Sequence, residues 1–397
     1  MPVYSADLIY TLTLPEPLSG YGIETDDSGI IISIEPLEHY QDNHREIQYV
    51  NGIIVPGFIN AHCHLELSHM KDLIPTGTGL IEFIKNVVTR RGETPIEAIL
   101  SEIAKGEDEM IREGIVAVGD ISNQTDTFYQ KSMGRLYYHT FVEAFDLLQH
   151  GRMEIELEKS RAILEQLTVP PGHKKSLVPH APYSVSRSMF NSLNDKNNND
   201  TSVSIHHQET LAENQFMFNK TGALMEFYQS LNLSLNDFDP IGAMSSRQVI
   251  DLMDPGRRTL LVHNTMSTPH DINAIQAWNP NTFWVTCPNA NLYIENRMPF
   301  YKYFMDQGVA VCIGTDSLAS NWRLSVLEEM KTIQRLQSYV PWELLLRWST
   351  MNGAKALGFD QDLGSLEVGK SPGLVNIYPF DQVKQQLVPD SQATRLI

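Results

Sequence analysis

His62 and His64 form the first pattern in this sequence that could do chemistry. They flank Cys63 at the end of an apolar run, IIVPGFINAHCH. If this run is a strand, its side chains alternate between two faces, so both imidazoles point the same way. Two neutral imidazoles side by side can bind one divalent metal ion. A chain with 13 histidines also contains such pairs by coincidence, so further residues must support the metal site.

Other polar residues end short apolar runs far apart in the chain, namely His180, His206, His263 and Asp316. Core strands are usually filled by Val, Ile and Leu, and a buried histidine without a partner costs free energy. In a parallel βα barrel the carboxyl ends of all strands meet on one face, where active sites are built. The whole set therefore favours a metal site over core packing.

Glu209 follows His206 by three residues in IHHQET. A carboxylate just past a metal ligand is well placed to take a proton from a water molecule activated by the metal. The alternative is an ordinary glutamate at a helix start, favoured there by the helix dipole. His207 competes with His206 as the ligand, but only one of two neighbours on a strand can face the barrel axis. The spacing to Glu209 favours His206.

The remaining candidates have structural alternatives of their own. Asp316 could complete the metal ligands and hydrogen-bond the water, or could be a turn or N-cap residue. His263 could polarise a developing charge, and His180 could touch substrate, although either could be a structural histidine. Four residues could contact substrate or serve packing: Glu66, Asn123, Glu143 and Trp322.

The elements that must position these residues follow from the pattern along the chain. The first fifty or so residues contain short β-branched runs separated by Gly, Pro and Asp, which predicts strands. From Ile53 onward, strands alternate with helices, including one predicted helix over PWELLLRWSTMNGAKALG, and DKNNND at 195–200 is predicted as a solvated loop. We therefore expect an α/β fold, a TIM (β/α)8 barrel over 54–363. Segments 1–53 and 364–397 would form a small discontinuous β-sandwich domain.

Composition limits the class of protein. The net charge of −18 disfavours nucleic acid and anionic membrane surfaces as partners. Three cysteines without a paired framework and the absence of a signal-peptide pattern or a long apolar run predict a cytoplasmic protein. The expected partner is a small-molecule substrate, with a homodimer as one candidate assembly. Phosphate-binding, dinucleotide-binding and serine-hydrolase motifs are missing from the sequence.

The ordered segments PGFINAHCHLELSH, VPHAPYSVS, IHHQET, LVHNT, TCPNANL and GTDSLASN resemble the amidohydrolase superfamily. The similar branch contains adenosylhomocysteine, guanine and cytosine deaminases and triazine chlorohydrolases. The resemblance runs from about Ile53 to Gly369. It implies one metal ion, usually zinc and sometimes iron, with the ligands His62, His64, His206 and Asp316. No lysine is an obvious candidate for bridging a second metal ion, so we expect a mononuclear site.

The same resemblance implies roles for the other candidates. Glu209 would shuttle a proton, His263 would orient water or stabilise charge, and Asp316 would assist them. His180 would lie in the substrate pocket, where we also expect Glu66. The segments HLELS and HAPYSV most resemble the aminodeoxyfutalosine deaminases of menaquinone biosynthesis.

The predicted function is hydrolytic deamination of a purine-type nucleoside or related heteroaromatic amine, with aminodeoxyfutalosine as the favoured substrate. Several alternatives stay open at this point. Other substrates for a deaminase are adenosylhomocysteine, methylthioadenosine, guanine and cytosine. Other functions are a triazine-type chlorohydrolase, a cyclic amide hydrolase and a non-catalytic barrel scaffold.

Overall fold

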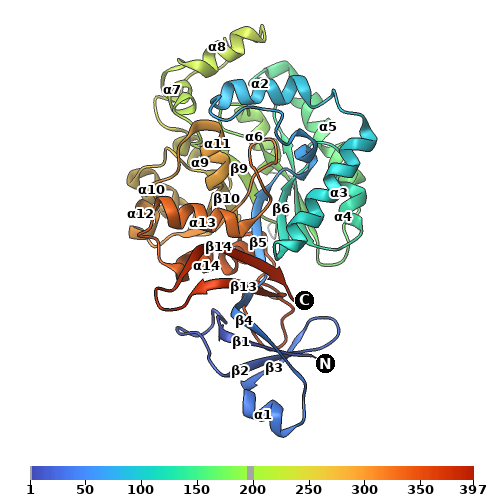
Figure 1. The fold of residues 1–397 in the computed structure, drawn as a ribbon. Helices are drawn as coiled ribbons and strands as arrows, with labels where there is room; N and C mark the ends of the chain where they lie inside the picture. Colours follow the sequence, from blue (N-terminus) through green and yellow to red (C-terminus); the bar gives the residue numbers. More distant parts are fainter. Residues whose placement is uncertain (1, 195–200) are drawn as a thin grey trace.

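The main body of the protein is a parallel barrel surrounded by helices (Figure 1). The computed structural model describes residues 2–194 and 201–397, so the loop predicted at 195–200 lies outside the described residues. Hydrogen bonds order the strands as β5-β6-β7-β8 and β9-β10-β11-β12. The two groups meet where His206 N donates to His180 O at 2.9 Å and Thr315 N donates to His62 O at 3.0 Å. The predicted TIM barrel is confirmed.

The barrel strands are short and almost wholly buried, as expected for parallel strands covered on both faces. Their bounds are β5 Phe58–Cys63, β6 Ile115–Ile121, β7 Tyr137–Ala144, β8 Lys174–Pro179, β9 Val203–His207, β10 Thr259–His263, β11 Thr282–Thr286 and β12 Ala310–Ile313.

Helices follow each barrel strand, and most of them cover the outside of the barrel. Those of the first half are η1 Leu65–Met70, α2 Leu80–Arg90, α3 Ile96–Arg112, α4 Phe128–Ser132, η2 His150–Arg152, α5 Met153–Gln166 and α6 Arg187–Asn194. Those of the second half are α7 Leu211–Asn219, α8 Ala223–Ser230, α9 Ser245–Leu252, α10 Pro269–Trp278, α11 Pro288–Glu295, α12 Tyr301–Asp306, α13 Val326–Leu336, α14 Trp342–Ser349 and α15 Met351–Leu357.

The two ends of the chain share one sheet with the strand order β14-β13-β4-β1-β2-β3. Its elements are β1 Val3–Ile9, β2 Tyr21–Thr25, β3 Ile31–Pro36, α1 Leu37–Asp42, β4 Ile47–Pro56, β13 Leu374–Asp381 and β14 Gln386–Arg395. The two segments therefore pair, through β4 and β13. The ladder is continuous through all six strands, so they form one sheet and not the two sheets of the expected sandwich. The boundaries at 53/54 and 363/364 stay predictions.

Two local expectations were wrong. The run IIVPGFINAHCH is two strands, because the chain turns from β4 into β5 at Gly57, where a Cβ would lie 2.6 Å from Pro372 O. The last predicted helix breaks at Thr350 (φ −134°, ψ −87°) into α14 and α15. The strand β14 lies in the segment 364–397 that was expected to form β-structure, although it contains Pro389 and Asp390, which are uncommon in strands.

A second apolar cluster lies over one end of the barrel. We call the helices α2, α7 and α8 the cap. They bury their own core, which includes Leu80, Phe83, Phe216, Leu224 and Tyr228, apart from the barrel core. Figure 1 shows the cap at the end of the barrel that is farthest from β1, β2 and β3. Within residues 2–194 and 201–397, no helix is both long and apolar enough to cross a bilayer.

Candidate metal centre

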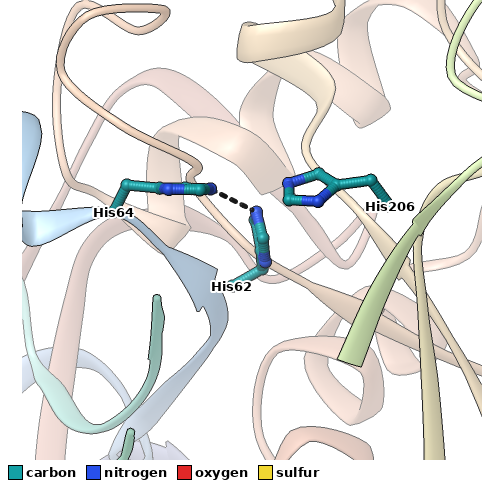
Figure 2. A group of neighbouring side chains, drawn as sticks. All are labelled: His62, His64 and His206. Atoms are coloured by element: carbon teal, nitrogen blue, oxygen red, sulfur yellow. Dashed lines mark hydrogen bonds between the residues drawn. The ribbon is translucent and has the colours of Figure 1, made fainter. Parts of the chain in front are cut away.

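Three histidines converge at the cap end of the barrel. His62 is on β5, His64 directly follows that strand, and His206 is on β9. Each offers a ring nitrogen, and these atoms all lie within 4.8 Å of one another. The Nε2 atoms of His62 and His64 are 3.2 Å apart, and Figure 2 shows the ring of His206 facing them from the opposite side. The alternation of a strand thus places both residues of the His-x-His pair on one side.

Asp316 lies beside this triad because β12 closes against β5. The amides of Thr315 and Asp316 both donate to His62 O at 3.0 Å. Gly314 permits this approach, since a Cβ there would lie 2.9 Å from backbone atoms of His62. Asp316 Oδ1 then lies 3.5 Å from His64 Nε2 and 3.8 Å from His62 Nε2. Ser320 Oγ donates to the other carboxylate oxygen at 2.9 Å.

The electrostatics of the triad suit a cation. Burial lowers the pKa of both His62 and His64, so their rings are neutral and offer lone pairs. Burial also opposes charge on His206, but the Glu143 carboxylate, 3.2 Å from Nδ1, outweighs it and raises the His206 pKa to about 9. The Glu143 carboxylate thus favours positive charge at His206. Metal-binding histidines commonly donate their other N–H to a carboxylate in this way.

His207 has a different environment. Its Nδ1 is hydrogen-bonded to Asn264 Oδ1 at 2.9 Å, and its ring packs 6.2 Å from that of Trp284. It therefore lies outside the triad.

Glu209 and His263 face each other next to the triad. Glu209 Oε1 is 3.7 Å from His263 Nε2, and His263 Nδ1 is hydrogen-bonded to Asn291 Oδ1 at 2.8 Å. Because the amide oxygen can only accept, the proton of a neutral ring is on Nδ1 and Nε2 is free to accept. Burial raises the pKa of Glu209 to about 8 and lowers that of His263 to about 4. Glu209 can therefore hold or release a proton near neutral pH.

His180 and Glu143 lie behind His206. The His180 ring is 5.0 Å from the His206 ring, and its Nδ1 is hydrogen-bonded to Ser184 Oγ at 2.7 Å. Glu143 also accepts from the side-chain amide of Asn123 at 2.7 Å. The sequence alone did not decide whether Glu143 contacts substrate or serves packing. Like His180, it lies near the end of a barrel strand.

Glu66 is buried on η1 with its carboxylate at the cavity wall. It accepts from the backbone amides of Asn123 and Gln124, both at 2.9 Å. Arg91 Nη2 lies 3.4 Å from its other oxygen. Burial raises the pKa of Glu66 to about 7. Trp322, by contrast, is half exposed and packs 5.2 Å from the ring of Tyr293.

An ion pair behind the triad was missed by sequence reasoning. Asp120, near the end of β6, accepts from the amide of Leu65 at 2.8 Å. Its other oxygen lies 2.6 Å from Lys131 Nζ, and both side chains are almost completely buried. Asp120 thereby fixes the backbone of Leu65, the residue that directly follows His64. Its place near a strand end is the signal that could have revealed it.

One cavity of about 670 Å³ connects these groups with the cap. Its polar wall includes His64, Glu66, Asn123, Glu143, His180, His206, Glu209, His263 and Asp316. This volume is in the usual range for small-molecule sites. The structure thus brings the sequence-predicted site residues to one place, with His62 buried next to the cavity lining, but Trp322 lies outside that lining.

Known proteins share this arrangement of elements. An adenosine deaminase of Helicobacter pylori is 25% identical over 386 residues, covering 94% of this chain and 91% of the relative. A 5′-deoxyadenosine deaminase of Methanobrevibacter smithii is 24% identical over 86% of this chain and 75% of the relative. The crystal structure of Helicobacter pylori aminofutalosine deaminase with methylthio-coformycin matches with a TM-score of 0.80 and 25% identity, covering 95% and 92% of the two chains.

The model of the Amidohydrolase family matches residues 53–391, which include the barrel and every candidate site residue. This match covers most of the chain and confirms the resemblance seen in the motifs. Amidohydrolases are metal-dependent hydrolases, in agreement with the histidine triad at the cap end of the barrel. The chain belongs to the amidohydrolase family.

Proposed function

We propose that this protein is a metal-dependent hydrolase that removes the amino group of a purine-type nucleoside, and that aminodeoxyfutalosine is its substrate. The observation behind this proposal is the convergence of three histidines, Asp316 and Glu209 at one end of a cavity large enough for a nucleoside. The deaminases among the relatives support the reaction type, and the aminofutalosine deaminase structure supports the choice of substrate.

The residues that would hold the metal ion are His62, His64, His206 and Asp316. Three imidazole nitrogens and one carboxylate oxygen form a donor set that suits zinc and also iron. A divalent ion held there would supply a Lewis acid, which lowers the pKa of water to about 7. Zinc is our proposal for its identity.

Glu209 would move the protons of the reaction. Water adds to the amine-bearing ring carbon, and one of its protons passes to Glu209 and from there to the adjacent ring nitrogen. A second proton goes to the amino group, which leaves as ammonia, and the ring carbon keeps the oxygen as a carbonyl. The burial of Glu209, which raises its pKa to about 8, favours this exchange near neutral pH.

His263 and Asp316 would stabilise the tetrahedral intermediate of this reaction. The neutral His263 ring, fixed by Asn291, presents Nε2 beside Glu209. Asp316, held by Ser320, presents Oδ1 on the other side of the triad as a hydrogen-bond acceptor. His180 and Glu66 would contact the nucleoside from the cavity wall.

A substrate screen tests this proposal. The metal-loaded enzyme is given adenosine, adenosylhomocysteine, methylthioadenosine, aminodeoxyfutalosine, guanine and cytosine, with ammonia release and the ultraviolet shift of the ring as readouts. We expect deamination of the purine nucleosides, with the highest kcat/KM for aminodeoxyfutalosine. Absence of ammonia from every compound would contradict the proposal. A cytoplasmic location and a homodimer stay predictions, which fractionation and light scattering can check.

A further inference from the structure

A buried glutamate beside the candidate site has no part in the proposed proton transfer itself. Glu213 is on α7, four residues after Glu209, and its side chain is completely buried. Taking a carboxylate out of water costs free energy unless hydrogen-bond donors compensate for the lost water. The donors that face Glu213 therefore indicate what this residue does.

Both carboxylate oxygens of Glu213 bind the backbone just before α7. Oε1 accepts from the amide of Gln208 at 2.9 Å, and Oε2 accepts from the amide of Glu209 at 3.0 Å. The spacing from Thr210 to Glu213 is that of a capping box, in which the glutamate binds the amide of the N-cap residue. Glu213 instead reaches past Thr210 and holds the amide of Glu209 and the amide before it.

The loop after β10 holds the same segment from its other side. Met266 N donates to Gln208 O at 3.0 Å, and Thr265 Oγ1 donates to Glu209 O at 2.6 Å. This loop directly follows His263, the residue that faces Glu209. The carbonyl groups of the segment are thus fixed to the loop after His263, and its N–H groups are fixed to α7.

The backbone of this segment depends on such contacts. Gln208 has a φ of +46°, in the left-handed region that a residue with a Cβ rarely adopts. A backbone of this kind persists only where the surrounding contacts determine it, and it is frequent at functional sites. Without the two bonds to Glu213, the segment would relax and carry the Glu209 side chain away from His263.

We propose that Glu213 is a positioning residue, which holds Glu209 at the place where it exchanges protons. The inference rests on the proposed function, in which Glu209 carries the protons of the reaction. Glu213 is completely buried and is not among the residues that line the cavity, so it acts through the backbone of Glu209 and not on the substrate.

A double-mutant cycle tests this role in the metal-loaded enzyme, with adenosine and aminodeoxyfutalosine as substrates. Glu213→Gln keeps one acceptor oxygen but turns an NH₂ group toward the second amide. We expect kcat/KM to fall by about tenfold or more, since a shift of about 1 Å in a reacting group can cost about 100-fold. In the Glu209→Gln background the same substitution should change kcat/KM by less than about twofold, because no proton carrier is left to misplace.

Glu107→Gln is the matched control. Glu107 is also completely buried, on α3, and it accepts from Tyr138 Oη at 2.9 Å and from Arg135 Nη1 at 3.1 Å. It is not among the residues that line the cavity. This variant loses a buried carboxylate as Glu213→Gln does, but it should leave kcat/KM of the folded enzyme unchanged.

The outcomes separate the inference from the proposed function. If the wild type deaminates neither substrate, the proposed function fails and the inference fails with it. If the wild type is active but Glu213→Gln lowers kcat/KM equally with and without Glu209, Glu213 serves the fold alone and only the inference is overturned. The same holds if Glu107→Gln lowers kcat/KM as much as Glu213→Gln does.

Amide hydrogen exchange gives a readout independent of turnover. In the enzyme without substrate, the peptide that contains Gln208 and Glu209 should exchange faster in Glu213→Gln than in the wild type, and at the wild-type rate in Glu107→Gln. Unchanged exchange in Glu213→Gln would overturn the inference. Should Glu213→Gln not fold, Thr265→Val removes the hydroxyl that holds Glu209 O from the other side. Its loss of kcat/KM should likewise vanish in the Glu209→Gln background, and a loss that persists there would contradict the inference.

Discussion

The two ends of the cavity are built in opposite ways. At the barrel end, the functional side chains have a second polar contact that fixes them: His206 with Glu143, and His263 with Asn291. At the cap end, apolar side chains such as Val88 and Leu231 face open space. The barrel end therefore has a buried network of polar contacts. The cap end has apolar surface that a bound ligand would remove from water. Chemistry needs fixed geometry, whereas selectivity for an apolar group needs only shape and area.

The largest expected effect concerns the ion pair behind the triad. Lys131→Met leaves the buried Asp120 carboxylate without its cation, and removing one partner of a buried pair costs about 3–5 kcal/mol. Denaturant unfolding should show this loss. The matched control is Lys105→Met, whose partner Glu102 lies at 2.6 Å but whose side chain is 67% exposed, and which should cost less than about 1 kcal/mol. Equal losses in the two variants would mean that the barrel end does not depend on its buried polar network.

A smaller but more specific effect concerns proton transfer. Glu209→Gln keeps the shape of the side chain but removes its ability to exchange a proton. We expect kcat/KM to fall by about 100-fold or more, while the metal content measured by mass spectrometry stays as in the wild type. Retention of near-full activity with an authentic substrate would exclude Glu209 as the proton carrier.

The pH dependence of stability tests how strongly the barrel end buries charge. Glu329 accepts from the amide of Asn289 at 2.8 Å and from the side-chain amide of Asn321 at 2.7 Å, and burial raises its pKa to about 8. The folded state favours the protonated form of Glu329. Its contribution to the free energy of unfolding is therefore complete below the ordinary pKa of 4.5 and is lost as the pH rises to about 8. The melting temperature of the wild type should therefore fall relative to that of Glu329→Gln across this range. Parallel curves would contradict the predicted shift.

The smallest effect is expected at the cap. Val88→Gln changes a side chain that is 67% exposed, so the free energy of unfolding should change by no more than about 0.5 kcal/mol. A loss of stability above about 1 kcal/mol would mean that Val88 serves the packing of α2 and not a ligand.

Sequence patterns predicted the barrel end better than the cap end, for a physical reason. Strand alternation and the shared face of strand ends depend on local geometry, so His62, His64 and Asp316 could be placed together without a structure. The apolar part of the cavity depends on how α2 and α8 pack over the barrel, and no local sequence pattern predicts this packing. Glu143 and Asp120 also lie near strand ends, but neither belongs to a sequence motif that would distinguish it from an ordinary buried polar residue.

Tertiary contacts override local propensity at two places. The strand β14 forms despite Pro389 because it pairs with β13 and because Gln334 of α13 hydrogen-bonds both the amide and the carbonyl of Leu387. The break at Thr350 has neither Gly nor Pro beside it to predict it. Both places lie outside the cavity, so they left the predicted site intact.

Metal stoichiometry tests the central claim most directly. The claim is that His62, His64, His206 and Asp316 bind a single divalent ion at the barrel mouth. Elemental analysis of protein purified in zinc-supplemented medium should find one ion per chain, reduced at least tenfold in His62→Ala and His206→Ala but retained in His207→Ala, whose ring packs against Trp284 instead. A metal content unchanged by the first two substitutions, or absent from the wild type after zinc loading, would contradict the account.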